Sequence, residues 1–263
     1  MKLISLNIWG GRIHKPLLKF IKEQSKNIDI YCFQEVFKSE KNIFSSEIKT
    51  DIFSDIKTVL KDYNAYYAPV VESTNLAERV DFQIFWGQAI FVRKTLKVSS
   101  EDNIFIFGKY NQDYTLLSEV KDKKDYIDFP RLMQCVIIRE NEKEILITNL
   151  HGYWIPDSKL DTPERLKQSD KIIKFLDSKK MPKVLCGDFN LNPGTKSMIK
   201  FEKNMTNLVK EYGIKNTRSK LHVRKDKFAD YILISPEVSV NEFKLIYKDV
   251  SDHLPLYLDF KIK

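Results

Sequence analysis

The chain has 263 residues, of which 43% are hydrophobic and 12% aromatic, a composition that excludes a disordered or fibrous protein and can bury a substantial core. Its formal net charge of +8 favours acidic partners such as nucleic acid, nucleotides or anionic lipid headgroups. Many lysines stand in mixed-charge runs such as Lys121-Asp122-Lys123-Lys124, however, and such runs are typical of solvated loops.

The cysteines and the apolar segments bear on the compartment. Cys32, Cys135 and Cys186 each lie inside an apolar run, and an odd number without a close pair argues against a disulfide framework and against a zinc site. The apolar run at 3–6 is too short for a signal peptide, and no window reaches the length of a membrane span. We therefore expect a monomeric protein of the cytoplasm without a membrane span.

The amino-terminal half alternates apolar runs with amphipathic segments, which predicts alternating strands and helices. A strand at 2–8 ends in Asn7, and the two glycines that follow predict a turn, because they lack the spacing of a phosphate loop. Pro16 marks the first turn of a helix. The elements after it are a strand at 28–33 that ends in Gln34-Glu35, an irregular helix within 40–62, and strands at 66–71 and 88–93. Residues 99–128 follow no pattern and are expected to form loops that select the substrate.

The carboxyl-terminal half contains the clearest helix, which Thr162 caps and in which Pro163 occupies the first position. The other expected elements are strands at 131–139, 145–150, 184–188, 231–234 and 254–260, a helix near 195–203 and a basic segment at 215–227. The chain has no internal repeat, linker or break in composition. We therefore expect a single domain over residues 1–263, with mixed sheets flanked by helices.

One stretch, Gly187-Asp188-Phe189-Asn190, follows a buried strand and precedes a proline. Because residues two apart in an extended chain point the same way, Asp188 and Asn190 can face one small target. A carboxylate beside a carboxamide suits the handling of a water molecule or a phosphate oxygen. The alternative is a polar turn closed by an Asx hydrogen bond.

Similar polar residues stand at the ends of other apolar runs, and this recurrence favours the functional interpretation. The residues at strand ends are Asn7, Glu35, His151 and Asp188, and those at strand starts are Asp230, Asp252 and His253. In a sheet with antiparallel neighbours these ends share one rim, so the side chains would converge on a single cleft. Carboxylates, carboxamides and histidines without a cysteine pair suit a hard cation, Mg²⁺ or Mn²⁺.

The residue types also suggest roles in phosphate chemistry. Asp188 is a candidate general base on water, held by Asn190, and His253 is placed to stabilise or protonate phosphate oxygens if Asp230 fixes its tautomer. Each residue alone has an ordinary structural explanation, such as a solvated carboxylate or a surface histidine. The functional interpretation therefore depends on their joint occurrence.

Taken together, the motifs resemble the endonuclease/exonuclease/phosphatase family, which includes deoxyribonuclease I, sphingomyelinases, inositol polyphosphate phosphatases and deadenylases. The matching motifs are Leu6-Asn7-Ile8-Trp9, Phe33-Gln34-Glu35-Val36, Thr148-Asn149-Leu150-His151, Gly187-Asp188-Phe189-Asn190, Ala229-Asp230-Tyr231-Ile232 and Ser251-Asp252-His253-Leu254-Pro255. They appear in the order of the family and span almost the whole chain.

The resemblance implies a four-layer α/β sandwich of two packed mixed sheets flanked by helices, and Mg²⁺-dependent cleavage of a phosphoester. Glu35 would bind the metal, with Asn7 and Asp252 beside it. The implied catalytic residues are Asp188 on the attacking water, Asn190 on the phosphate, Asp230 orienting His253, and His151 on the phosphate or the leaving group. Trp9 replaces an acidic or amide residue typical of abasic-site endonucleases, which puts abasic-site repair in doubt.

Four further residues are candidates for substrate binding. Trp154 could stack on a base, sit at a lipid surface or pack in an aromatic turn. Arg131, Arg165 and Arg218 could bind phosphates or serve as structural ion-pair partners. The leading hypothesis is an Mg²⁺-dependent phosphodiesterase acting on nucleic acid or nucleotides. The alternatives are a phosphatase or phosphodiesterase for a small molecule or lipid headgroup, and an inactive phosphate-binding module.

Overall fold

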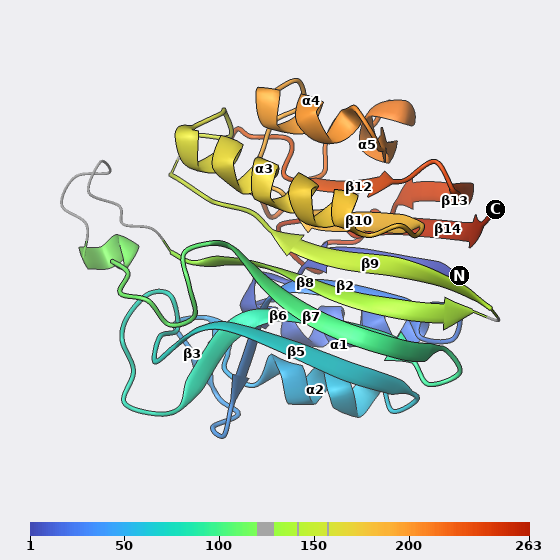
Figure 1. Ribbon diagram of the computed structural model, residues 1–263. Helices are drawn as coiled ribbons and strands as arrows, with labels where there is room; N and C mark the ends of the chain where they lie inside the picture. The colour runs from blue at the N-terminus through green and yellow to red at the C-terminus, as the bar shows by residue number, and fades with distance from the viewer. Residues whose placement is uncertain (120–128, 141, 157) are drawn as a thin grey trace.

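Two six-stranded sheets pack face to face, and helices cover the outer side of each sheet, in a computed structural model that describes residues 1–119, 129–140, 142–156 and 158–263 (Figure 1). The resulting layers are helix, sheet, sheet and helix. This is the four-layer α/β sandwich that the resemblance implied.

The first sheet has the strand order β13-β14-β1-β2-β6-β5. Its strands are β1 (Lys2–Asn7), β2 (Ile30–Ser39), β5 (Tyr63–Glu72), β6 (Ile84–Arg93), β13 (Val238–Leu245) and β14 (Leu256–Ile262). Strands β1 and β2 are parallel, and the other neighbours are antiparallel. The carboxyl-terminal strands therefore complete the sheet that the amino-terminal strands begin.

The second sheet has the order β11-β12-β10-β9-β8-β7 and again a single parallel pair, β9 with β10. Its strands are β7 (Lys97–Phe107), β8 (Arg131–Glu140), β9 (Lys143–His151), β10 (Lys183–Asp188), β11 (Thr206–Asn207) and β12 (Asp230–Ile234). A separate small hairpin joins β3 (Phe44–Ser45) to β4 (Ile48–Lys49).

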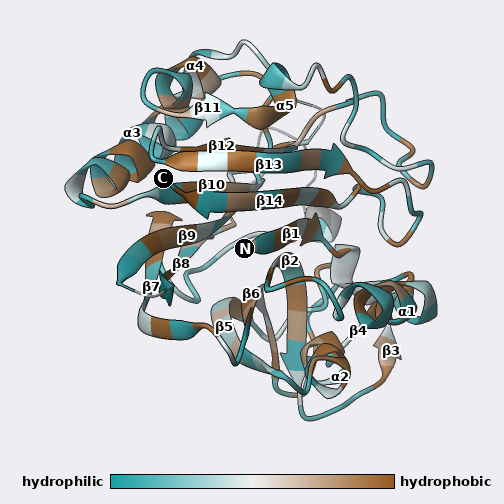
Figure 2. Ribbon diagram, turned by 90° about the vertical axis from the view of Figure 1, so that its right-hand side faces the viewer, coloured by the Kyte–Doolittle hydropathy of each residue, from teal (hydrophilic) through white to brown (hydrophobic). Residues whose placement is uncertain are grey.

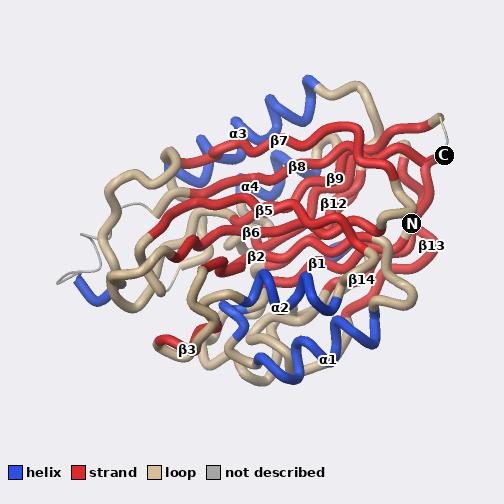
Figure 3. Tube along the Cα trace, turned by 90° about the horizontal axis from the view of Figure 1, so that it is seen from below, coloured by secondary structure: helices blue, strands red, loops and turns tan. Residues whose placement is uncertain are grey.

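Each parallel pair is connected by a helix, as a parallel crossover requires. Helix α1 (His14–Gln24) links β1 to β2, and α3 (Pro163–Ser178) links β9 to β10. Helices α1 and α2 (Ile52–Val59) lie side by side below the first sheet (Figure 3). Helices α3, α4 (Lys196–Glu202) and α5 (Leu208–Glu211) lie above the second (Figure 1), and short 3-10 turns occur at η1 (Trp9–Gly11) and η2 (Leu117–Glu119).

The main core lies between the two sheets and continues under α3 and α4, and a second core fills the space between the first sheet and α1 and α2. Hydrophobic residues gather on the strands and hydrophilic ones on the loops (Figure 2). None of the helices in the described ranges is long and apolar enough to cross a membrane.

The structure differs from the sequence-based expectation in three segments. Only 52–59 of the expected irregular helix at 40–62 is helical, because 44–49 forms the small hairpin. Strand β7 occupies 99–107 of the segment 99–128, which was expected to form loops; residues 120–128 lie outside the described part. Strand β13 was not anticipated. Both β7 and β13 are edge strands, and most of their side chains are exposed or half-buried, so their sequences lack the apolar alternation of a core strand.

Candidate active site

The predicted site residues meet at one end of the two parallel strand pairs. Asn7 and Glu35 come from β1 and β2, and His151 and Asp188 come from the last positions of β9 and β10. In open α/β sheets the carboxyl ends of parallel strands form a crevice where ligands bind. Here two such crevices face each other across the sheet interface. A cavity of about 350 Å³ lies there, and Glu35, His151 and Asp188 line it.

Local backbone features aim the site residues into this cavity. Glu35 lies at a bulge in β2, where the pairing with β6 shifts between Gln34 and Val36, and its φ is +56°. A bulge re-aims the side chain of the strand that carries it. Gly187 has a φ of +134°, and a Cβ there would lie 2.0 Å from the carbonyl oxygen of Leu150. Glycine at this position therefore lets β9 and β10 approach closely.

Asn7 lies between two carboxylates. Its Nδ2 donates to Glu35 Oε1 at 2.9 Å and to Asp188 Oδ2 at 3.1 Å. Burial raises the pKa of Glu35; the hydrogen bond from Asn7 opposes this shift, and the nearby charges of Asp252 and Asp188 add to it. Glu35, Asp188 and Asp252, three of the four described carboxylates that line the cavity, thus lie near one another, and a divalent cation would relieve their mutual repulsion. The donor set of Glu35, Asn7 and Asp252 therefore fits a hard metal ion.

Asp188 is held as an ionised carboxylate. Its Oδ1 accepts from the backbone N–H of Asn190 at 2.9 Å, and its Oδ2 lies 3.8 Å from Nε2 of both His151 and His253. Burial opposes ionisation, but the positive charges of His253 and Lys159 outweigh it and hold the pKa of Asp188 below its usual range. An ionised carboxylate is the form that can accept a proton from water.

His253 and Asp230 form a buried pair. His253 Nδ1 lies 2.8 and 2.9 Å from the two oxygens of Asp230, and Thr217 Oγ1 donates to Asp230 Oδ2 at 3.1 Å. This pairing leaves Nε2 facing the cavity. Burial and Arg218 lower the pKa of His253, and Asp230 and Asp252 raise it by more, so that the net shift is upward.

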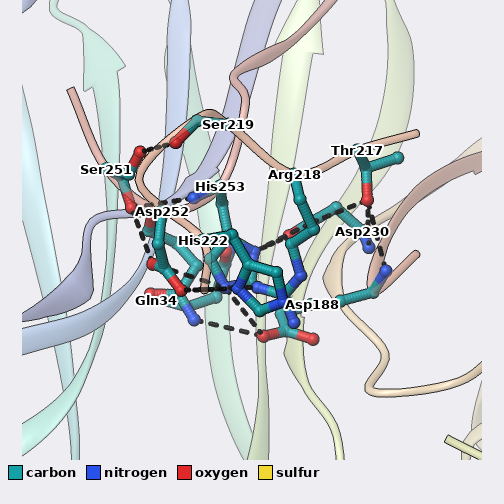
Figure 4. Close-up of polar contacts among 12 residues, drawn as sticks. Gln34, Asp188, Thr217, Arg218, Ser219, His222, Asp230, Ser251, Asp252 and His253 are labelled. Carbon is teal, nitrogen blue, oxygen red and sulfur yellow. Dashed lines mark hydrogen bonds and ion pairs between the residues drawn. The ribbon is translucent and has the colours of Figure 1, made fainter. Parts of the chain in front are cut away.

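Arg218 Nη1 contacts His253 Nε2 (Figure 4). Because the guanidinium can only donate, Nε2 accepts in this contact, which therefore forms only while Nε2 carries no proton. Protonation of Nε2 therefore requires Arg218 to move aside.

Asp188, Asp230 and His253 could also hold a cation, because a ligand atom of each lies within 4.8 Å of the others. That reading is weaker than the one for Glu35, since Asp230 and the Nδ1 of His253 already satisfy each other.

The loop between α5 and β12 carries residues that the sequence analysis did not identify. His222 lies with Nδ1 3.5 Å from Asp252 Oδ2 and Nε2 3.2 Å from Asp226 Oδ1. Arg218 Nη2 lies 3.0 Å from Asp226 Oδ2, and its Nη1 lies 3.7 Å from Asp252 Oδ2. This chain of charges fixes Arg218 and Asp252. The segment was expected only to be basic, and its one acidic residue gave no periodic signal.

Lys159 was also not anticipated. It lies in the loop before α3, is 6% exposed, and donates to Asn190 Oδ1. Asn190 Nδ2 donates to the carbonyl of Gly152 at 3.1 Å, so the contacts of this carboxamide are with the protein. Burial lowers the pKa of Lys159 to about 8.

Three of the four predicted substrate-binding residues line the cavity, namely Trp154, Arg131 and Arg218. The prediction for Arg165 is wrong. Its side chain is fully buried and donates to the backbone carbonyls of Tyr153, Ser158 and Leu160. Arg165 therefore shapes the loop that carries Trp154 and Lys159, and it is not among the described residues that line the cavity.

Comparison with known proteins bears on the identity of the chain. The sequence model of the Endonuclease/Exonuclease/phosphatase family matches residues 4–253. The chain belongs to this family. Members of the endonuclease/exonuclease/phosphatase family are phosphoric ester hydrolases, and the protein is an enzyme of that class. The resemblance inferred from the six motifs is thereby confirmed.

Solved structures of the family share the fold. The alignment with one from Bacteroides vulgatus covers 100% of this chain and 98% of the other, at 16% identity and a TM-score of 0.70. The mannosyl-6-phosphatase of Bacteroides thetaiotaomicron covers 100% of both chains, at 17% identity and a TM-score of 0.66. The human Nocturnin catalytic domain with bound sulfate covers 100% of this chain and 93% of its own, at 20% identity and a TM-score of 0.67. No curated protein matches the chain.

Proposed function

We propose that the protein is a divalent-metal-dependent phosphodiesterase that hydrolyses nucleic acid or nucleotides by attack of water on phosphorus. The observation that carries the proposal is the convergence of ionised Asp188, the Asp230–His253 pair and the Glu35 carboxylate on one cavity. A general base, an oriented histidine and a hard-cation donor set are the parts that phosphoester hydrolysis requires.

In the proposed mechanism, Asp188 accepts a proton from the attacking water. The backbone N–H of Asn190 and the amide of Asn7 fix the orientation of the carboxylate. Mg²⁺ held by Glu35, with Asn7 and Asp252 beside it, would polarise the phosphate and stabilise negative charge. Arg218, one of the cations in the cavity wall, binds a non-bridging phosphate oxygen and thereby moves away from Nε2 of His253.

The two histidines have different roles. Burial and the neighbouring Arg131 hold the pKa of His151 well below its usual range, so this imidazole stays neutral. A neutral ring suits a hydrogen bond to a phosphate oxygen. His253 has a raised pKa and a partner on Nδ1, so it is the better donor of a proton to the leaving oxygen.

The alternative of a phosphatase for a small phosphorylated molecule uses the same machinery, and one similar structure is named a mannosyl-6-phosphatase. An inactive binding module is disfavoured because the residues for base, acid and metal are all present and face one cavity.

The test is hydrolysis of a substrate panel with Mg²⁺ and with EDTA. The panel contains single- and double-stranded DNA, RNA, bis-p-nitrophenyl phosphate, inositol phosphates and sphingomyelin. Cleavage of nucleic acid or the diester that stops in EDTA is expected. Release confined to phosphate monoesters would establish the phosphatase, and full activity in chelator would defeat the metal assignment.

Two variants of the enzyme, assayed on the same substrates, test the assignment of Asp188 as the base and of His253 as the acid. Asp188→Asn and His253→Ala are each expected to lower kcat by about 10²-fold to 10⁴-fold, the range for general acid–base groups. His14→Ala is the matched control, since His14 pairs with Asp55 beside the small hairpin and not with a site residue. Undiminished turnover by a folded Asp188→Asn protein would remove that residue from the mechanism.

A further inference from the structure

A second cavity of about 570 Å³ adjoins the catalytic one. The two cavities share five lining residues, which are Trp154, Lys159, Val223, Arg224 and Asp226. The segments that carry them lie before α3 and before β12. The site therefore continues past the catalytic centre into a space of the size that binds a small ligand.

The charge of the second cavity is positive. Of the described residues, Lys159, Arg224 and Lys225 line it, against one carboxylate, Asp226. That carboxylate is already engaged by Arg218 at 3.0 Å and by His222 at 3.2 Å. The cations of this cavity therefore exceed the anions available to them, which favours a phosphate over a neutral ligand.

The second cavity also presents flat and apolar surface. The guanidinium of Arg224 lies 5.2 Å from the ring centroid of Trp154, a cation–π pair at the boundary of the two cavities. Leu160 and Val223, which line the same space, are 62% and 96% exposed. A planar ring with an attached phosphate matches both properties.

We propose that the second cavity is a subsite for the nucleotide next to the scissile phosphate. Its base stacks on the Trp154–Arg224 pair, and its own phosphate binds Arg224 and Lys225. The inference rests on the proposed phosphodiesterase function and narrows its substrate to a chain of at least two nucleotides. Aromatic rings and arginine planes bind unpaired bases in this way, with little dependence on base identity.

The test compares two kinds of substrate. The first is a 5′-phosphorylated dinucleotide, of DNA and of RNA. The second is bis-p-nitrophenyl phosphate, which has no second nucleotide. For Arg224→Ala and Lys225→Ala, the ratio of kcat/KM on the better dinucleotide to that on the simple diester is expected to fall by about fivefold to 100-fold. Loss of one stacking or phosphate contact causes a change of this size. The measurement is made in Mg²⁺ at fixed ionic strength.

Lys227→Ala is the matched control. Lys227 is exposed and lies on the same loop, but it is not among the described residues that line either cavity. Its ratio is expected to stay within twofold of the unchanged enzyme. An equal fall in this variant would show a general effect of charge and would overturn the subsite.

The remaining outcomes separate the subsite from the function on which it rests. An enzyme that cleaves both substrates, with a ratio unaffected by Arg224→Ala and Lys225→Ala, overturns the subsite and leaves the phosphodiesterase intact. Discrimination by these variants on a short-chain phospholipid, but not on the dinucleotides, overturns the nucleotide assignment. An unchanged enzyme that hydrolyses no diester overturns both proposals.

Discussion

Four of the described residues that line the catalytic cavity, among them Leu76 with a φ of +73°, share an unusual backbone conformation. Trp9, Glu35 and Asn190 have φ values of +52°, +56° and +55°, in the left-handed region that residues with a side chain rarely adopt. Each such residue destabilises the fold by about 1–3 kcal/mol, and it persists only where the surrounding structure holds it. Glu35 and Asn190 lie among the groups proposed to act on the phosphate. Backbone strain therefore occurs at residues that are proposed to take part in the hydrolysis.

Replacement of Glu35 separates stability from activity. Glu35→Gln keeps the shape of the side chain and removes one of three neighbouring negative charges. In EDTA the midpoint of thermal unfolding is expected to rise by about 2–4 °C, the shift that roughly 1 kcal/mol produces in a chain of this size. Hydrolysis in Mg²⁺ is expected to be lost, together with the stabilisation that Mg²⁺ gives the unchanged enzyme.

Melting curves with and without Mg²⁺ measure both effects. Glu23→Gln, on the exposed face of α1, is the control and should leave both unchanged. A Glu35→Gln protein that retains its Mg²⁺-dependent rise in melting temperature would place the metal elsewhere in the cavity.

The lowered pKa of Lys159 predicts how the activity depends on pH. Because burial lowers its pKa to about 8, the ammonium is charged at neutral pH and loses its proton as the pH rises through that value. The positive charge that attracts a phosphate is lost with it. The kcat/KM of the free enzyme is therefore expected to fall above about pH 8, since this constant reports the pKa of groups in the unliganded protein.

A pH profile of kcat/KM from pH 6 to 10 measures this effect. In Lys159→Met the activity should be lower at neutral pH and the decline near pH 8 should disappear. Persistence of the same inflection in the variant would assign it to another group.

At the scale of the element, the loop between β9 and α3 is organised by the helix that follows it. Thr162 caps α3, its side chain accepting from the N–H of Arg165, and Arg165 in turn holds three carbonyls of the loop. The helix thereby positions Trp154 and Lys159, although neither belongs to it. The buried arginine acts on the loop rather than on the substrate.

Arg165→Met is expected to lower the free energy of unfolding by at least about 2 kcal/mol, because buried carbonyls lose their donors. It is also expected to raise KM more than it lowers kcat, since the loop that carries Trp154 and Lys159 is loosened. Urea denaturation and steady-state kinetics measure the two effects. A variant that is as stable as the unchanged protein, with only kcat reduced, would indicate that Arg165 contacts the substrate directly.

The elements also show what the sequence could reveal. The strands that carry Asn7, Glu35, His151 and Asp188 are buried on both faces, so they stand out as apolar runs and their polar ends are conspicuous. The residues that were missed, Lys159, His222 and Asp226, lie on loops whose positions depend on tertiary contacts. Arg165 was misassigned for the converse reason, because no pattern in the sequence distinguishes an arginine that binds carbonyls from one that binds phosphate.

At the scale of the whole molecule, a buried polar contact joins the two sheets. Gln34 Nε2 donates to Asn149 Oδ1 at 2.6 Å, and Asn149 Nδ2 donates to the carbonyl of Phe33 at 3.0 Å. Both side chains are fully buried. Gln34 precedes Glu35 and Asn149 lies two residues before His151, so this contact fixes the two halves of the site relative to each other.

Asn149→Leu is expected to lower the free energy of unfolding by at least about 2 kcal/mol, because Gln34 loses its buried partner. The double variant Gln34→Leu/Asn149→Leu should recover part of that loss, since Gln34→Leu removes the amide that Asn149→Leu leaves without its partner. Urea denaturation of the single and double variants measures the coupling. Strictly additive losses would contradict a direct contribution of this contact.

The pairing of β1 with β14 bears on how the nascent chain folds. Ser251, just before His253, donates to the carbonyl of Asn7 across 244 residues of chain, at 2.7 Å. During synthesis β1 leaves the ribosome before β14. The edge of β1 that pairs with β14 therefore stays unpaired until β14 has been made. A nascent chain that stops before Ser251 lacks both the strand that closes this edge and the proposed acid, His253. The proposed acid and the strand that covers the edge of β1 therefore join the fold together, and hydrolysis is expected only from chains that contain both.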